Sequence, residues 1–102
     1  MHLVEILLPA ADNTGRPIHP RHYDELRDML TRRFGGLTAF SRSPAKGFWR
    51  PGEEVTHVDD VIIFEVMADE LDREWWGALR KELERAFQQA EIVIRSHEIE
   101  RL

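Results

Sequence analysis

The feature that most constrains the fold is an apolar run with a carboxylate inside it, at residues 59–67. The run reads Asp-Asp-Val-Ile-Ile-Phe-Glu-Val-Met, and its β-branched residues favour a strand. A strand this apolar is typical of the centre of a sheet that is covered on both faces. Glu65 interrupts the run, and a carboxylate in such a place must be paired, protonated or close to water. The run therefore locates the sheet and singles out the face that carries Glu65.

Hydrophobic spacing assigns the other elements. Residues 3–8, 37–43 and 91–97 are predicted strands, and the apolar run extends back to a third strand that starts at Val55. A turn at residues 51–54 and an interruption at 44–47 indicate a long hairpin between the second and third strands. A helix is predicted over residues 21–34, closed by Gly35 and Gly36. A second helix starts after its N-cap Asp72. Its predicted inward side chains are Trp76, Leu79, Leu83, Phe87 and Ala90.

This order of elements predicts one α+β domain over residues 1–102. The plan βαββαβ is that of a ferredoxin-like sandwich, with strand order 4-1-3-2 and both helices on one face. Folding the hairpin about its predicted turn sets Arg42 opposite Ile63 and Phe40 opposite Glu65.

Alternation along each strand then divides the side chains between two faces. Val4, Ile6 and Leu8 are expected under the helices, together with matching apolar residues of the third and fourth strands. We call the other side the open face. Its predicted members are Leu3, Glu5, Leu7, Thr38, Phe40, Arg42, Val61, Ile63, Glu65, Met67, Val93, Arg95 and His97. A face this apolar is expected to be covered by a second subunit or around a ligand.

The ionisable side chains of the open face are the candidate catalytic groups. Glu5 and Glu65 belong to neighbouring strands, and two close carboxylates can divide the roles of acid and base. His97 is a third candidate. The alternative is a buried ion-pair network, in which Arg42 and Arg95 neutralise the carboxylates and fix the register of a dimer.

Ligand-binding candidates lie on the same face and on the hairpin. Arg42 and Arg95 are predicted anchors for an anionic group, with Phe40 and Trp49 as apolar walls. The basic residues near Arg42 are also compatible with a solvated hairpin that has no ligand.

Composition excludes several classes of function. The chain has no cysteine, and zinc at His19 and His22 would need further ligands that only His57, His97 or a carboxylate could supply. Two exposed loop histidines are the favoured interpretation, so no metal and no cofactor are expected. The net charge of −5 and the aliphatic third strand argue against nucleic-acid binding. No apolar run approaches the roughly 20 residues that span a bilayer, and the first residues do not resemble a signal peptide. These features favour a cytoplasmic protein that does not contact a membrane.

Three stretches carry a resemblance to known proteins: residues 33–40, 60–67 and 72–76, which read RFGGLTAF, DVIIFEVM and DREWW. They resemble a group of short bacterial proteins of unknown function, over nearly the whole chain. The plan is also similar to the dimeric α+β barrel superfamily, whose members pair two ferredoxin-like sheets face to face. Some of those members are cofactor-independent oxygenases or isomerases, and others bind or regulate. The resemblance implies a fold and a homodimer, and it transfers no catalytic residue.

Three functions are compatible with these observations. The first is a small cytoplasmic dimer that binds a small anionic organic ligand on the open face. The second is a cofactor-independent enzyme of the isomerase or oxygenase type, with Glu65 as acid or base. The third is a structural partner subunit whose open face serves protein contact alone. A solvent-reachable pocket beside Glu65 would favour the first two functions over the third.

Overall fold

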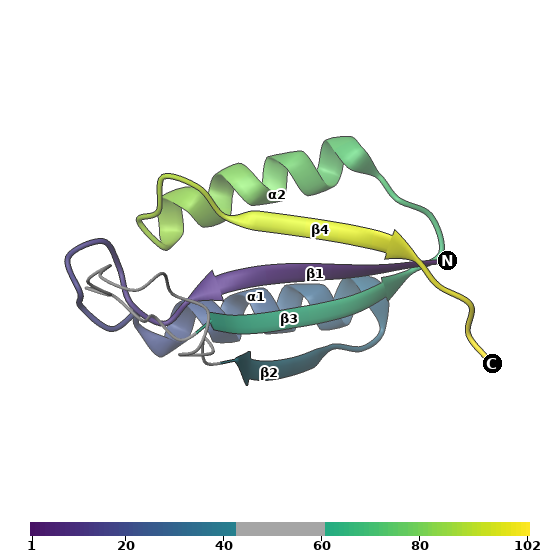
Figure 1. Cartoon of the computed structure of the whole chain (residues 1–102), viewed down its shortest axis with the longest axis horizontal. Coiled ribbons are helices and arrows are strands. Elements are labelled where there is room, and N and C mark those ends of the chain that lie inside the picture. Colours follow the sequence, from purple (N-terminus) through teal and green to yellow (C-terminus); the bar gives the residue numbers. More distant parts are fainter. Residues whose placement is uncertain (43–60) are drawn as a thin grey trace, which may run out of the picture.

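A computed structural model describes residues 1–42 and 61–102 of the protein (Figure 1). This part of the chain forms an α+β fold with a four-stranded antiparallel sheet and two helices. The elements in chain order are β1 (His2–Pro9), α1 (Pro20–Phe34), β2 (Thr38–Arg42), β3 (Val61–Ala68), α2 (Arg73–Ala86) and β4 (Val93–Glu98).

The predicted sheet, with order 4-1-3-2 and a long hairpin, needs correction. The observed order is β2-β3-β1-β4, which has the same neighbours when counted from the opposite edge. The hairpin register, however, differs from the prediction by two residues. Thr38 pairs with Glu65 and Phe40 pairs with Ile63, where the sequence placed Phe40 opposite Glu65. A shift by two residues leaves each side chain on its predicted face, so alternation alone could not detect it. The predicted turn at 51–54 and strand start at Val55 lie outside the described residues.

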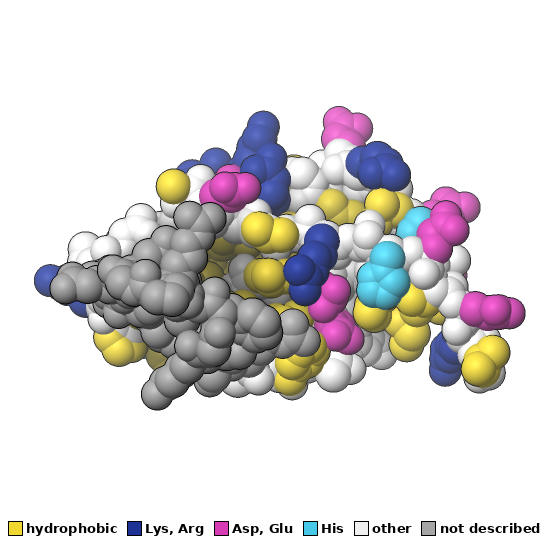
Figure 2. All heavy atoms as spheres, in the orientation of Figure 1, with side chains coloured by type: hydrophobic (Ala, Val, Ile, Leu, Met, Phe, Trp, Pro, Cys, Tyr) yellow, Lys and Arg dark blue, Asp and Glu magenta, His cyan; other side chains and the backbone are white. Residues whose placement is uncertain are grey.

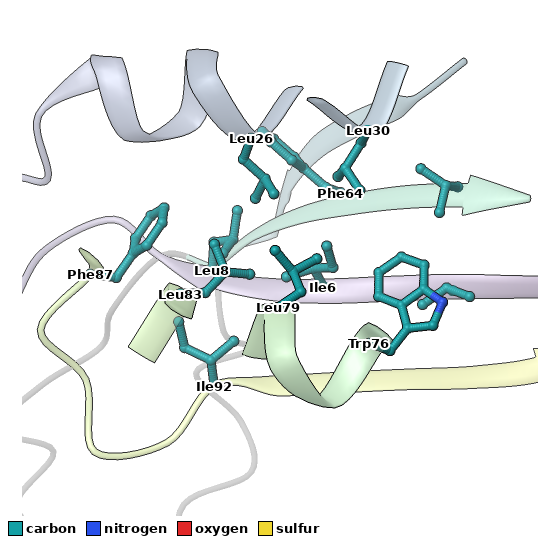
Figure 3. Close-up of a cluster of buried hydrophobic side chains, with 12 residues drawn as sticks. Ile6, Leu8, Leu26, Leu30, Phe64, Trp76, Leu79, Leu83, Phe87 and Ile92 are labelled. Atoms are coloured by element: carbon teal, nitrogen blue, oxygen red, sulfur yellow. The ribbon is translucent and has the colours of Figure 1, made fainter. Parts of the chain in front are cut away.

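Both helices cover one face of the sheet, as predicted. Figure 3 shows Leu26 and Leu30 of α1 and Leu79 of α2 pointing toward Ile6 and Leu8 of β1. The fully buried side chains include Phe87, Ile6, Leu8, Leu30 and Val4. Ile62 and Ile94 also pack against this cluster. One contiguous core on one side of the sheet leaves the other side without helical cover.

The helix ends follow local chemistry. Gly35 ends α1 with φ of 80°, in the left-handed region that glycine adopts without strain. The Asp72 side chain caps α2 by accepting a hydrogen bond of 3.1 Å from the backbone N–H of Trp75. The helix α2 ends earlier than predicted, because Gln88 has φ of 51° and cannot continue it. Ala90 is therefore exposed and not an inward residue.

In the described residues, neither helix has the length and apolar character needed to cross a membrane.

The turn after β1 is held by one carboxylate. Asp12 accepts hydrogen bonds from the Thr14 hydroxyl at 2.6 Å, from the Thr14 N–H at 2.8 Å and from the Arg16 N–H at 3.0 Å. The hydroxyl of Thr14 is the main reason that the pKa of Asp12 lies below its usual value. Nearby, the Tyr23 hydroxyl donates to the carbonyl of Pro9, and partial burial raises the pKa of this phenol. These contacts join the end of β1 to the start of α1.

Candidate functional site

Four residues form a polar row that crosses all four strands on the open face. The pairing places Thr38 opposite Glu65, Glu65 opposite Glu5, and Glu5 opposite Arg95. Side chains directly opposite one another in an antiparallel pair have Cβ atoms about 4.5–5.5 Å apart. The two carboxylates that the sequence placed on neighbouring strands are thus direct cross-strand partners.

The charges of this polar row are not balanced. Arg95 Nε lies 3.3 Å from Glu5 Oε1, and the Glu5 side chain is only 13% exposed. Glu65 is half-buried, and no described residue forms a hydrogen bond or ion pair with it. Like charges directly opposite each other in a sheet are destabilising. The described part of the row therefore carries two carboxylates against one guanidinium.

Apolar rows flank the polar row on both sides. The cross-strand partners Phe40, Ile63, Leu7 and Val93 form one of them. Met67 and Leu3 form the other, which His97 extends on β4. Figure 2 shows the face with a basic and an acidic side chain adjacent to each other among hydrophobic ones. Met67 and Val93 are 45% and 44% exposed, whereas Ile63 is buried.

Glu65 also lines an open groove of about 1060 Å³. The groove runs from Thr38 and Glu65 past Leu3 and Met67 toward the C-terminal end of α1. Its charged lining residues are Arg33, Glu65, Asp69, Glu70 and Arg101. We call this hollow the Glu65 groove. Solvent thus reaches the candidate acid or base, and groups of both charges converge around it.

The structure brings together some predicted site residues and separates others. Glu5, Glu65 and Arg95 meet in the polar row. Arg42 does not, because its backbone pairs with Val61, four residues along β3 from Glu65. The correction follows from the register of the hairpin. Since the side chain of Arg42 is not described, its predicted role as an anion anchor stays a prediction.

The remaining predicted residues lie at the margins of this site. Phe40 is half-buried in an apolar row and is not among the described residues that line the Glu65 groove. His97 is exposed opposite Leu3, on the same face as Arg95 and two residues along β4. Trp49 lies outside the described residues.

Sequence reasoning missed two contributors to the groove. Thr38 was placed on the open face but not in the site, because the predicted register set Phe40 beside Glu65. Arg101 lines the groove from the C-terminal segment, which follows β4 and has no periodic pattern to place it. Alternation placed Thr38 on the correct face but could not set it opposite Glu65, and no sequence signal could have found Arg101. Among the described residues, no group of three or more His, Asp or Glu could hold a metal ion.

Comparison with known proteins supports the fold. No protein-family model and no curated protein matches this chain. A solved structure of a phage SAM lyase, in complex with S-methyl-5'-thioadenosine, is similar, with a TM-score of 0.59 and 19% sequence identity. The similarity covers 95% of this chain and 80% of that chain. At this level of identity the two proteins share a fold, and the likeness carries no residue role.

Proposed function

We propose that the protein binds a small organic molecule in the Glu65 groove, with a positively charged group of the ligand against Glu65. The observation that carries this proposal is the polar row, in which Glu65 faces a second carboxylate and has no described cation beside it. A carboxylate in that position gains stability from a cationic partner. The half-buried setting strengthens the interaction, because less water screens it than at an exposed site.

The ligand charge that we propose here differs from the one expected from the sequence. An anionic ligand was expected because two guanidiniums, Arg42 and Arg95, were placed around the carboxylates. The register leaves Arg95 as the only described cation of the polar row, and it already contacts Glu5. Arg33 and Arg101 also line the groove, together with Asp69 and Glu70. A zwitterion fits this distribution, with its cationic group at Glu65 and its anionic group toward the two arginines.

The apolar rows supply the rest of the binding energy. Met67 and Leu3 line the groove next to Glu65, and Met67 is nearly half exposed. Burying apolar surface contributes roughly 25 cal/mol per Å², so an apolar ligand body on this wall adds affinity without directional bonds. A second copy of the chain that covers the open face would enclose such a ligand.

A panel of probe molecules tests the proposal by calorimetry. S-adenosylmethionine is a suitable probe, because a zwitterionic amino-acid group is joined to its sulfonium cation. S-methyl-5'-thioadenosine lacks both that group and the cation. We expect the zwitterion to bind more tightly to the wild-type chain. Glu65→Gln, which keeps the shape and removes the charge, should weaken its binding at least tenfold. Glu82→Gln makes the same change on the exposed surface of α2 and should leave binding unchanged.

Two results would contradict the proposal. One is equal affinity for the charged and uncharged probes. The other is equal affinity of the wild type and Glu65→Gln for the zwitterion. If Glu65→Gln instead weakens self-association and leaves ligand binding unchanged, the role of Glu65 is structural, as in a partner subunit.

A second candidate is a cofactor-independent lyase. Its support is the shared fold with a phage SAM lyase, together with a carboxylate that solvent and a small molecule can reach. Glu65 would act as the acid or base, a role that a carboxylate near a second carboxylate can take. Incubation with S-adenosylmethionine, followed by mass spectrometry for S-methyl-5'-thioadenosine, tests the activity. Formation of product by the wild type and by Glu82→Gln, and its loss in Glu65→Gln, would support the lyase. Equal product with all three proteins would exclude a role for Glu65.

A further inference from the structure

A second hollow lies between α2 and β4, and apart from Arg95 none of its lining residues belongs to the polar row. Its volume is about 220 Å³. Trp76 and Ile94 contribute apolar wall, and both pack on the core cluster under the helices. Figure 1 shows α2 running alongside β4, which is an edge strand of the sheet. This α2–β4 pocket is smaller than the roughly 300–1,000 Å³ of sites for drug-sized ligands, so it suits a fragment-sized molecule.

The polar lining of the α2–β4 pocket is basic. Arg73 and Arg80 are seven residues apart on α2, which is close to two helical turns and brings them to one side of the helix. Arg80 Nη1 lies 3.4 Å from Glu84 Oε2, and Arg73 has no ion-pair partner among the described residues. Arg95 reaches the lining too, with its Nε directed at Glu5. No carboxylate is among the described residues that line the pocket. In a chain of net charge −5, this is a local region of positive potential.

Gly77 keeps the hollow open. It lies inside α2, where glycine costs about 0.8–1.0 kcal/mol relative to alanine. A Cβ atom at this position would meet nothing within 4 Å, so packing does not require glycine. A larger side chain at Gly77 would extend into the free space that the pocket provides.

We infer that the α2–β4 pocket binds the carboxylate or phosphate of a small organic molecule. The apolar body of the ligand would lie against Trp76 and Ile94. Its anionic group would lie between Arg73 and Arg80, whose planar guanidiniums match the oxygens of either anion. This site is separate from the Glu65 groove, and it takes the opposite charge. Arg95 lines this pocket and also belongs to the polar row.

NMR titration of the ¹⁵N-labelled full chain tests the inference. The probes are benzoate, phenyl phosphate and benzyl alcohol, which share one ring and differ in charge. We expect benzoate or phenyl phosphate to shift the Gly77 amide and Trp76 indole signals in a saturable way. Benzyl alcohol should bind at least tenfold more weakly. The tighter of the two anions identifies the carboxylate or the phosphate as the natural group.

Variants separate this pocket from general surface charge. Arg73→Gln and Arg80→Gln should each weaken the better anion at least threefold, and Gly77→Leu should abolish its binding by filling the space. Lys81 is the exposed residue directly after Arg80 on α2, so Lys81→Gln should leave the affinity for the anion unchanged. Glu65→Gln should also leave it unchanged, which distinguishes this site from the Glu65 groove. Thermal melting of each variant tests whether the fold persists.

Three outcomes would overturn the inference. The first is no saturable shift with either anion at millimolar concentration. The second is equal binding of benzyl alcohol, which would show that no anion is recognised. The third is retention of full affinity by a folded Gly77→Leu, which would place the probe elsewhere on the surface.

Discussion

At Gly35 a single residue determines how α1 ends. Its φ of 80° lies in the left-handed region, and its N–H donates to the carbonyl of Thr31. A Cβ atom there would meet no neighbouring atom within 4 Å, so any effect of a substitution comes from the backbone conformation alone. Gly36 is next in sequence, has equal space around it and does not have a left-handed φ. Substitutions at Gly35 and Gly36 therefore separate the strain of a left-handed φ from the effect of replacing any glycine.

We predict that Gly35→Ala lowers the free energy of unfolding by about 1–2 kcal/mol, because an L-residue in the left-handed region carries that strain. Gly36→Ala should change it by less than about 0.5 kcal/mol, as expected for an exposed position without such a constraint. Urea denaturation of both variants measures the difference. Equal losses of stability would show that the helix does not end as described.

At the scale of elements, the two adjacent tryptophans of α2 lie in different environments. Trp76 is 6% exposed and stacks on Phe34, with ring centroids 5.3 Å apart and planes inclined by 14°. Trp75 is half-buried, and the guanidinium of Arg33 lies 4.1 Å from the centre of its ring. The helical spacing predicted this difference, because Trp76 shares a side of the helix with Leu79 and Trp75 is turned about 100° away.

We predict that Trp76→Ala lowers the free energy of unfolding by about 3–5 kcal/mol, as expected for a large aromatic side chain removed from a core. Trp75→Ala should lower the free energy of unfolding by less. It loses part of its packing and the cation–π contact with Arg33, which is worth about 0.5–1 kcal/mol when exposed. Thermal and urea unfolding of both variants provide the measurement. Similar losses for the two would contradict the assigned orientation of α2.

The elements also show what sequence can and cannot predict here. Alternation placed Glu5, Glu65 and Arg95 on one face, and the pairing of β1 with β3 and β4 confirms it. Side-chain period fixes the face of a strand but not its register, so the partner of Glu65 on β2 was predicted wrongly. Register in a hairpin depends on its turn, and the predicted turn at 51–54 lies outside the described residues. As a result, Thr38 takes the place predicted for Phe40 opposite Glu65, and the backbone of Arg42 lies four residues from Glu65 along β3.

At the scale of the whole molecule, both described helices lie on the same side of the sheet. The helices bury one face, while the open face still exposes Met67 and Val93. Domains of about 100 residues hide a modest share of their surface, so association would add to a small reserve of stability. A two-fold axis through the polar row would bring the carboxylates of one subunit toward guanidiniums of the other. We propose a homodimer that forms through this face and encloses the Glu65 groove.

We predict that the protein sediments at twice the mass of its chain at micromolar concentration, and that Val93→Glu shifts it toward the monomer. Val93 lies in the apolar row of the open face and is 44% exposed, so a buried carboxylate there would be unpaired in the dimer. The matched control is Ala78→Glu, on the exposed surface of α2, which should sediment as the wild type does. If Ala78→Glu dissociates the protein and Val93→Glu does not, the helices form the contact and the open face belongs to ligand alone. A wild-type monomer would remove the dimer altogether, leaving the Glu65 groove as a site within one chain.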